Sequence, residues 1–196
     1  MNKSALLIID VQNDYFPGGK MALHEPEQAL AKITELLQFY RQQQWPVIHI
    51  QHEMYDRPNR PAAFFLPHTK GQQLHPAVLP AENETLLIKH FPSSFAGTGL
   101  LEVLQQQQIK QLIICGMMTH MCVDTTTRAA FDLGFDVQVA IDATATKALT
   151  FSGNTVSADQ VKTTVAAALH GTFAQVTPTA ELLTALSNRT GFYLSE

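Results

Sequence analysis

The chain has 196 residues, of which 45% are hydrophobic, and it carries a formal net charge of −4 with a pI near 6.0. This length and apolar content fit one globular domain, residues 1–196, with a full core. The charge excludes the basic footprint of nucleic-acid-binding proteins, and no lysine and arginine cluster marks a membrane-binding patch.

The N-terminal apolar run Ala5–Ile9 is too short for the core of a signal peptide, and it ends at Asp10. No stretch approaches the length of a membrane span. The two cysteines, Cys115 and Cys122, lie 7 positions apart and do not resemble a disulfide framework. We therefore expect a cytoplasmic protein whose reduced thiols serve either chemistry or core packing.

Short apolar runs alternate with amphipathic segments along the chain. The apolar runs predict strands at residues 5–9, 47–50, 86–88, 112–115, 137–141 and 173–176. Helical spacing predicts helices at residues 26–43, 99–107, 121–133, 158–169 and 179–186. Such alternation is typical of an α/β fold, and continuous apolar strands are typical of a sheet covered on both faces. We expect a three-layer αβα sandwich with a parallel, Rossmann-like sheet of about six strands.

Residues 53–73 are rich in proline and polar side chains, which predicts a long loop. Loops of this length in a compact domain are usually functional or mobile. We expect pocket walls from this loop, from residues 150–156 and from a neighbouring subunit.

In an open parallel sheet, ligands bind beyond the carboxyl ends of the strands. The predicted strands end at Asp10, Lys89, Gly116 and Asp142, and Cys122 follows in the first turn of a predicted helix. A helix N-terminus and a nearby lysine favour a thiolate, and a carboxylate can pass the thiol proton to a leaving amine. Gly116 would allow a tight turn, and N–H groups of that turn would form an oxyanion hole. The pattern indicates a nucleophilic cysteine.

Four segments resemble the isochorismatase-like hydrolases, also called the cysteine hydrolase superfamily, over nearly the whole chain. These segments are LLIIDVQNDYFPGG (6–19), LLIKHFPSSFAGTGL (86–100), IICGMMTHMCVDTTTRAAFDLGF (113–135) and VAIDATAT (139–146). The third segment keeps Gly116, Thr119, Cys122 and Val123, and it is the specific one. The resemblance implies a parallel αβα sandwich that assembles as a homo-oligomer.

The resemblance also implies a role for each member of a catalytic triad. Asp10 would be the general base and acid, Cys122 the nucleophile, and Lys89 the cation that orients and stabilises. A non-proline cis peptide between Met117 and Met118 would aim the Met118 N–H at the oxyanion, beside the Cys122 N–H. Substrates of the family include nicotinamide, N-carbamoyl compounds, ureidoacrylates, related amides and the enol ether of isochorismate.

The sequence departs from the nicotinamidase branch of the family, which binds a metal through an Asp-x-His pair after the second strand. Here the stretch IQHEMYDRP has His52 and Met54 at those positions. The eight histidines form no zinc pattern, and no HExxH motif occurs. The segment 97–99 lacks the third glycine of a dinucleotide fingerprint. We therefore expect neither a metal nor a cofactor.

Several further residues have both a structural and a functional interpretation. Cys115 lies inside an apolar strand and is expected in the core, and Asp142 is expected to organise a loop rather than to act in catalysis. Four side chains are tentative substrate contacts, although each would also suit a structural role. They are Phe16, Phe91, His52 and His120.

Three hypotheses for function follow. The first is hydrolysis of a C–N bond in a small amide, ureido or carbamoyl compound through a thioester on Cys122. The second is hydrolysis of a vinyl ether, as in isochorismatase, with Asp10 as an acid and a dispensable thiol. The third is a non-enzymatic binding protein on the same fold, and the intact triad argues against it. All three imply a small-molecule partner rather than a nucleic acid or a membrane.

Overall fold

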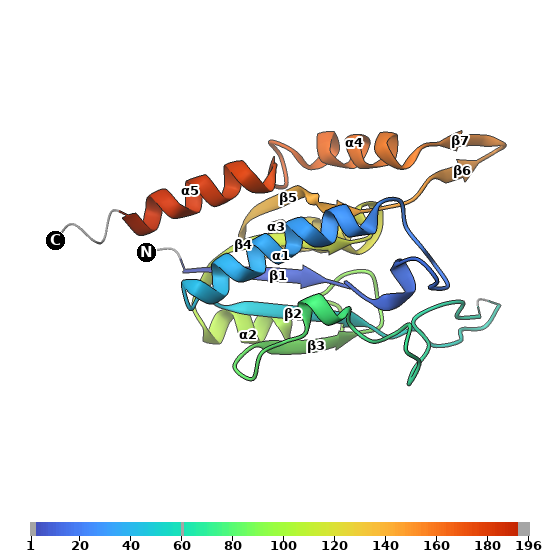
Figure 1. Cartoon of the computed structure of the whole chain (residues 1–196), viewed down its shortest axis with the longest axis horizontal. Helices are drawn as coiled ribbons and strands as arrows, with labels where there is room; N and C mark the ends of the chain where they lie inside the picture. Colours follow the sequence, from blue (N-terminus) through green and yellow to red (C-terminus); the bar gives the residue numbers. More distant parts are fainter. Residues whose placement is uncertain (1–2, 60, 192–196) are drawn as a thin grey trace.

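The computed structural model describes residues 3–59 and 61–191 (Figure 1). Six strands form the main sheet: β1 (Lys3–Ile9), β2 (Val47–His52), β3 (Thr85–Lys89), β4 (Ile109–Met117), β5 (Asp136–Ala145) and β8 (Gln175–Thr177). The helices are α1 (Pro26–Gln42), α2 (Leu100–Gln106), α3 (Asp124–Asp132), α4 (Ala158–Leu169) and α5 (Thr179–Gly191). A separate hairpin pairs β6 (Leu149–Phe151) with β7 (Asn154–Val156). No helix of the described residues is long and apolar enough to cross a membrane.

The six strands are all parallel, in the order β3-β2-β1-β4-β5-β8. The chain builds outward from β1 to β3 on one side and then returns to start β4 on the other side of β1. The β1–β4 boundary is therefore the point where the winding direction reverses, and this is where doubly wound sheets bind ligands. The predicted parallel sheet is confirmed.

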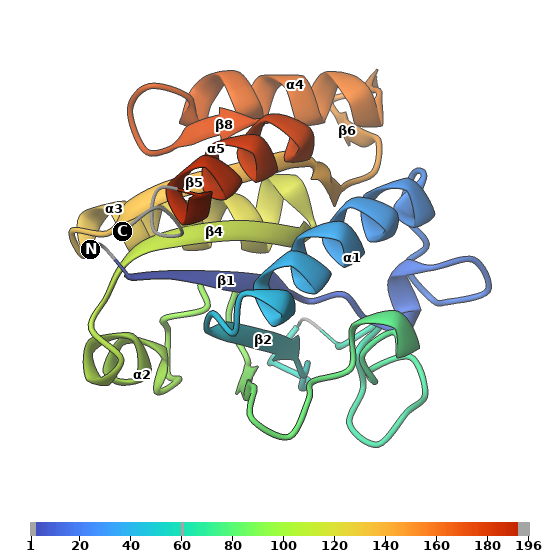
Figure 2. The same ribbon diagram turned by 60° about the vertical axis from the view of Figure 1, so that its left-hand side comes forward.

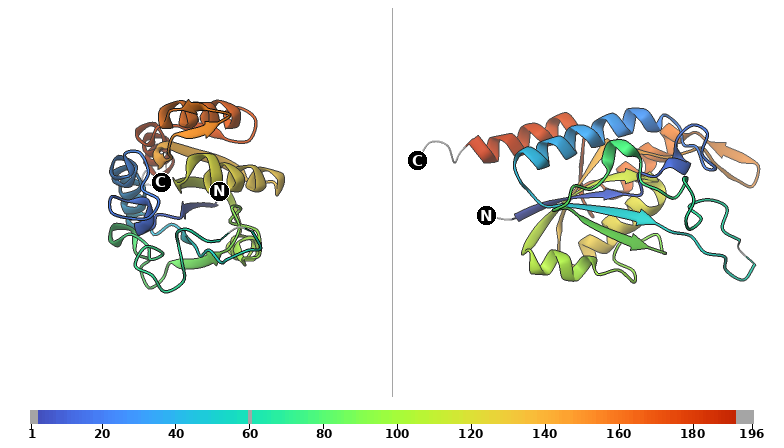
Figure 3. Two further views of the ribbon diagram at one scale, coloured as in Figure 1. Left: turned by 90° about the vertical axis from the view of Figure 1, so that its right-hand side faces the viewer. Right: turned by 60° about the horizontal axis from the view of Figure 1, so that its bottom comes forward.

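Two apolar cores lie on opposite faces of the sheet. Leu6 and Ile8 of β1 belong to a cluster with residues of α1 and α5, whereas Leu7 and Ile9 belong to a cluster with residues of α2 and α3. Successive strand side chains point to opposite faces, which explains the unbroken apolar run. Figure 2 shows α1 and α5 in front of the sheet, and the right-hand view of Figure 3 shows α2 on its other side. The predicted three layers are confirmed.

The C-terminal half of β5 differs from the prediction. A register shift after Ile114 lets Thr144 and Ala145 pair with the end of β4, so β5 continues to Ala145 instead of ending at residue 141. Asp142 therefore lies within the strand and not at its end. Its Oδ1 accepts hydrogen bonds from the backbone N–H and the hydroxyl of Thr179, the first residue of α5. Asp142 thus organises the start of that helix.

Two other boundaries also differ. The helix expected from residue 121 begins only at Asp124, because residues Thr119–Val123 form a π-helical turn. The last strand is Gln175–Thr177 rather than 173–176, since Phe173 and Ala174 bond back to the end of α4. The hairpin β6–β7 was not predicted, because its two strands have 3 residues each and are largely exposed.

The long loop expected at residues 53–73 contains no helix or strand among its described residues. Asp14 anchors it to the end of β1. Its Oδ2 accepts the Phe65 N–H at 2.7 Å, and a Cβ at Gly71 would lie 2.1 Å from its Oδ1. A larger residue at position 71 would therefore displace the Asp14 carboxylate from its bond to Phe65.

Candidate active site

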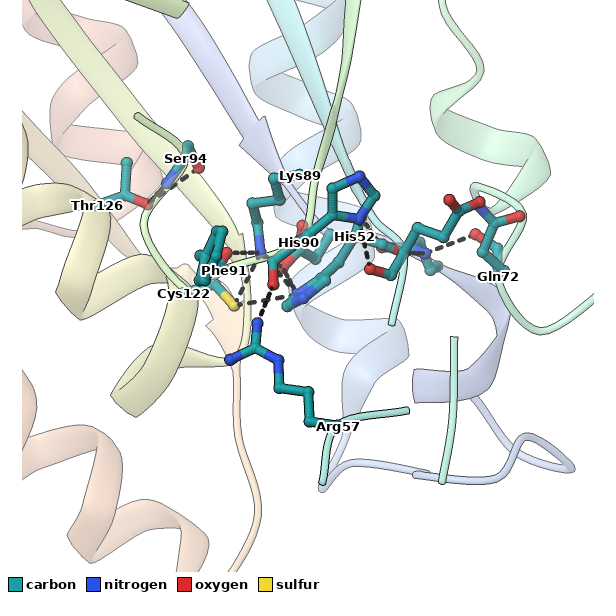
Figure 4. Close-up of polar contacts among 12 residues, drawn as sticks. His52, Arg57, Gln72, Lys89, His90, Phe91, Ser94, Cys122 and Thr126 are labelled. Carbon is teal, nitrogen blue, oxygen red and sulfur yellow. Dashed lines mark hydrogen bonds and ion pairs between the residues drawn. The ribbon is translucent and has the colours of Figure 1, made fainter. Parts of the chain in front are cut away.

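Four neighbouring strands each present one polar side chain at the same edge of the sheet. In sheet order these strands are β3, β2, β1 and β4, and their residues are Lys89, His52, Asp10 and Cys122. Cys122 follows β4 by way of the π-helical turn. The cluster therefore spans the point where the winding reverses, and Figure 4 shows the polar contacts of its members His52, Lys89 and Cys122.

Asp10 and Lys89 form an ion pair in which both side chains are wholly buried. The distance from Lys89 Nζ to Asp10 Oδ2 is 2.7 Å. Asp10 has a φ of 51°, a left-handed conformation that is uncommon for a residue other than glycine and is often found at functional sites. Its Oδ1 is buried and has no hydrogen-bond partner among the described residues. This oxygen is available to a thiol, an amine or a water molecule.

In this pair, each charged group stabilises the charged form of the other. Burial acts to raise the pKa of the Asp10 carboxyl, but Lys89 and His52 more than offset it, so this pKa lies below its ordinary value. Burial acts to lower the pKa of the Lys89 ammonium, but the negative charge of Asp10 raises it above its ordinary value. Asp10 is therefore an ionised carboxylate at neutral pH, and Lys89 is protonated.

Cys122 lies against this pair with only 3% of its surface exposed. Its Sγ is 3.2 Å from Lys89 Nζ. Burial and the charge of Asp10 raise the pKa of the Cys122 thiol well above its ordinary value, and Lys89 reverses this only in part. The help expected from the first turn of a helix is absent, because α3 begins only at Asp124. The resting group is a thiol, placed beside a carboxylate that can take its proton.

His52 is the fourth member of the cluster. Its Nδ1 lies 2.8 Å from Lys89 Nζ, 3.6 Å from Asp10 Oδ2 and 3.8 Å from Cys122 Sγ. An ammonium group is only a donor, so the contact with Lys89 requires Nδ1 to act as the acceptor. The tentative placement of His52 near the reacting groups agrees with this geometry, although its closest contact is Lys89.

Three side chains of the cluster carry atoms of the kinds that bind metal ions. One ligand atom from each of Asp10, His52 and Cys122 lies within 4.8 Å of the other two. The Lys89 ammonium is within 3.2 Å of all three side chains, so a cation already stands where a metal would have to bind. Met54, at the second position of the expected metal pair, packs against the apolar core. These residues do not fit the metal site of the nicotinamidase branch.

The remaining tentative contacts divide into two groups. Phe91 is 46% exposed at the rim of the site, and its backbone oxygen accepts a hydrogen bond from Lys89 Nζ at 3.2 Å. Phe16 is instead buried and packs on His75, with ring centroids 4.4 Å apart. The Nδ1 of His120 bonds the Thr146 hydroxyl at 2.6 Å, toward the end of β5. Neither Phe16 nor His120 contacts the cluster through these interactions.

The backbone between β4 and the π-helical turn has a special geometry. The peptide bond between Met117 and Met118 is cis. The Met118 carbonyl accepts hydrogen bonds from the N–H groups of Met121 and Val123, at 3.0 and 3.3 Å. These bonds close the turn that carries Cys122. The Met118 and Cys122 N–H groups remain our candidates for an oxyanion hole.

One structural residue of the site, Gln12, was missed in the sequence, and the role of a second, Gly116, was interpreted wrongly. Gln12 clamps the backbone of His52 from both sides, because its Nε2 donates to the His52 carbonyl and its Oε1 accepts the His52 N–H, each at 2.8 Å. Gly116 permits close packing of strands rather than a tight turn, since a Cβ there would lie 2.0 Å from the Ile9 oxygen. Gln12 lies only two positions after Asp10, in the segment DVQND, and this proximity was the available signal.

Comparison with known proteins agrees with this fold. Residues 4–181 match the family model of the isochorismatase domain. The isochorismatase family protein YddQ of Bacillus subtilis (strain 168) is 44% identical, covering 92% of this chain and 98% of the relative. A crystal structure assigned to the isochorismatase hydrolases, from Oleispira antarctica, has a TM-score of 0.88 with 45% identity, covering 93% of this chain and 97% of that one.

A streptothricin hydrolase of Streptomyces noursei is 35% identical over 72% of this chain and 49% of that protein. The resemblance predicted from the motifs is thus confirmed. The chain belongs to the isochorismatase family. It is a hydrolase of that family, so the hypothesis of a non-enzymatic binding protein is set aside.

Proposed function

We propose that the protein hydrolyses a C–N bond of a small amide, ureido or carbamoyl compound through a thioester on Cys122. The observation that carries this proposal is the contact between a buried thiol, a lysine ammonium and an ionised carboxylate. Such a set supplies a nucleophile, a stabilising cation and a general base within one cluster. The relative named streptothricin hydrolase adds support for hydrolytic chemistry.

In the first half of the reaction, Asp10 takes the thiol proton while the Cys122 sulfur bonds to the substrate carbonyl carbon. The carbonyl electron pair moves onto oxygen, and the N–H groups of Met118 and Cys122 stabilise this oxyanion. When the oxyanion collapses, the C–N bond breaks and the leaving amine takes the proton from Asp10. Lys89 stabilises the developing thiolate and keeps Asp10 ionised between turnovers.

In the second half, Asp10 removes a proton from a water molecule, whose oxygen attacks the thioester carbonyl. The C–S bond breaks, the acid product leaves, and Cys122 regains a proton from Asp10. The raised pKa of the thiol supports this scheme, because proton removal has to accompany attack rather than precede it. An ordinary exposed cysteine without a nearby base would not serve.

The alternative is hydrolysis of a vinyl ether, the reaction after which the family is named. That reaction requires an acid to protonate the enol ether. Asp10 is a poor candidate in the resting site, because Lys89 and His52 keep its pKa below the ordinary value. That mechanism also makes no use of the contact between Cys122 Sγ and Lys89 Nζ, which lie 3.2 Å apart. C–N hydrolysis is therefore the better supported reaction.

Ammonia release from a panel of small primary amides, ureas and N-carbamoyl amino acids tests the proposal. We expect Cys122→Ala to abolish turnover, and we expect intact-mass spectrometry of rapidly quenched wild-type enzyme to find an acyl adduct on Cys122. Cys115→Ala is the matched control, because Cys115 is a buried thiol inside β4. Full turnover by Cys122→Ala, or hydrolysis of isochorismate alone, would refute the thioester mechanism.

We also propose that the protein acts as a homo-oligomer. The family resemblance supports this, and so do exposed apolar side chains on the hairpin β6–β7, where Phe151 is 84% exposed and Val156 is 42% exposed. Exposed apolar side chains mark protein–protein contacts where they form a contiguous patch, and we place such a contact on this hairpin. Light scattering after size-exclusion chromatography measures the oligomeric state, and a monomeric Phe151→Asp variant would identify the hairpin as part of the interface.

A further inference from the structure

A guanidinium group lies at the rim of the candidate active site. Arg57 comes from the loop after β2, and its Nη2 donates to the carbonyl oxygen of His90, the residue directly after Lys89, at 3.0 Å. The guanidinium carbon also lies 4.8 Å from the centre of the Phe91 ring. Figure 4 shows the Arg57 side chain extending toward the cluster that contains Lys89 and Cys122. Two contacts thus hold a flexible side chain in one place.

The positive charge of Arg57 has no ion-pair partner within residues 3–59 and 61–191. The two acids near it in the loop are engaged elsewhere. Glu53 bonds two neighbouring side chains, and Asp56 accepts a backbone N–H. Of the five N–H donors of a guanidinium, the bond to His90 uses one. Arg57 therefore presents an unused, charged donor surface.

The open donors of Arg57 favour an anion. Asp10 and Lys89 cancel each other's charge inside the cluster. At the rim, the carboxylates of Glu53 and Asp56 are hydrogen-bonded to other groups, whereas the Arg57 guanidinium keeps donors without a partner among the described residues. Inside the cluster, Asp10 Oδ1 is an acceptor without a partner in the described part of the chain, and it suits a thiol or amide proton. At the rim, the open groups are the donors of Arg57, and they suit a part of the substrate that brings acceptors.

From these contacts we propose that Arg57 is the substrate-recognition residue and that the amide bears a carboxylate. This inference rests on the proposed amide hydrolysis. A planar guanidinium binds a carboxylate through two parallel hydrogen bonds, and stacking on Phe91 fixes the plane of the fork before the substrate arrives. The exposed Phe91 ring also offers an apolar surface to the carbon chain between carboxylate and amide. Holding the carboxylate at the rim directs the amide carbonyl toward Cys122.

The first test uses two alkylating reagents of similar size, iodoacetate and iodoacetamide, which differ in charge. The rates at which the two reagents modify Cys122 are measured by mass spectrometry. The rate with iodoacetate is divided by the rate with iodoacetamide, and this ratio is then divided by the same ratio for free glutathione. We expect Arg57→Ala to lower this ratio by about fivefold or more and Arg57→Glu to lower it further. The rate with iodoacetamide should stay near the wild-type value.

Arg128→Ala is the matched control. Arg128 also stacks on a phenylalanine ring, with its guanidinium carbon 4.4 Å from the centre of Phe173, but Asp124 already satisfies its charge through hydrogen bonds of 3.0 and 3.1 Å. We expect this variant to keep the wild-type ratio. An unchanged ratio in Arg57→Ala, or an equal fall in both variants, would overturn the proposal.

The second test compares succinamate with its neutral methyl ester as amide substrates, measured by ammonia release. We expect the wild type to prefer succinamate and Arg57→Ala to raise its KM by about tenfold or more with little change in kcat. The ester should be affected little. An equal loss on both substrates would contradict carboxylate recognition. If the wild type hydrolysed no amide of any charge, the proposed function would fail, and the alkylation ratio would still decide the role of Arg57.

Discussion

Lys89 Nζ lies 2.7 Å from Asp10 Oδ2, and neither side chain is exposed to solvent. Removal of one partner leaves the other charge buried without compensation, which typically costs about 3–5 kcal/mol. We therefore expect Lys89→Met to lose that much unfolding free energy at pH 7, as measured by urea denaturation. Without Lys89, burial raises the pKa of Asp10 above its ordinary value. The deficit should shrink as the pH falls and Asp10 becomes protonated.

The double variant Asp10→Asn/Lys89→Met is the control for this prediction. It removes both charges and keeps similar volumes, so it should recover most of the lost unfolding free energy. It should nevertheless release no ammonia from any amide. If the double variant were as unstable as Lys89→Met, packing around the lysine chain rather than the ion pair would explain the loss.

The thiol of Cys122 gives an independent measure of the same charges. Burial and Asp10 raise its pKa, whereas Lys89 lowers it. Asp10→Asn should therefore react faster with iodoacetamide at pH 7 than the wild type, and Lys89→Met should react more slowly. Amide turnover should fall in both, by about 100-fold or more in Asp10→Asn, because a general base contributes on that scale. Slower alkylation of Asp10→Asn would instead mean that Asp10 promotes ionisation in the resting enzyme.

The sequence was sufficient for the sheet and for three members of the cluster. Two apolar runs ended at Asp10 and Lys89, and Cys122 followed a third run that ended at Gly116. Because parallel strands present their carboxyl ends at one edge, these three residues could be placed together in advance. The roles of these three residues remain proposals. The length of β5 could not be predicted, because it depends on a register shift against β4 rather than on local apolar pattern. The start of β8 could not be predicted either, because Phe173 and Ala174 bond back to the end of α4.

The electrostatic state of the site could not be predicted from the sequence either. Cys122 was expected in the first turn of a helix, whose N-terminus would favour ionisation of the thiol, but the helix begins at Asp124. Burial beside Asp10 determines the sign of the thiol pKa shift. The bond between His52 and Lys89 depends on the pairing of these two residues across β2 and β3, which a single sequence does not state.

Away from the active site, the surroundings of Glu84 predict how the free energy of unfolding depends on pH. It precedes β3 and accepts hydrogen bonds from Arg41 of α1 and the Ala81 N–H, and it pairs with His49 of β2. Burial acts to raise the pKa of Glu84, but these partners more than offset it and lower this pKa to about 2. A lowered pKa in the folded state stabilises the fold above about pH 4.5, and this contribution is lost as the pH falls toward 2.

We expect Glu84→Gln to lose about 1–2 kcal/mol of unfolding free energy at pH 7, a moderate value because Arg41 is partly solvated. The difference from the wild type should narrow steadily between pH 5 and pH 3 in urea denaturation series, taking about 4.5 as the ordinary pKa of the carboxyl. Glu82→Gln, at an exposed neighbouring position, should match the wild type throughout. If the difference in unfolding free energy between Glu84→Gln and the wild type stayed constant with pH, packing rather than the charge of Glu84 would explain it.

Gly116 of β4 pairs with Ile9 of β1, and Ile9 directly precedes Asp10. A Cβ at position 116 would lie 2.0 Å from the Ile9 oxygen, and the φ of +121° is strained for any residue with a side chain. Gly116→Ala should therefore cost about 3 kcal/mol or more in unfolding free energy. It should also lower amide turnover, because the backbone shift it forces reaches Asp10. Gly99→Ala, whose Cβ would meet open space, should change stability by no more than about 1 kcal/mol and leave turnover intact. Equal effects of the two substitutions in urea denaturation would show that close packing of β1 against β4 does not position Asp10.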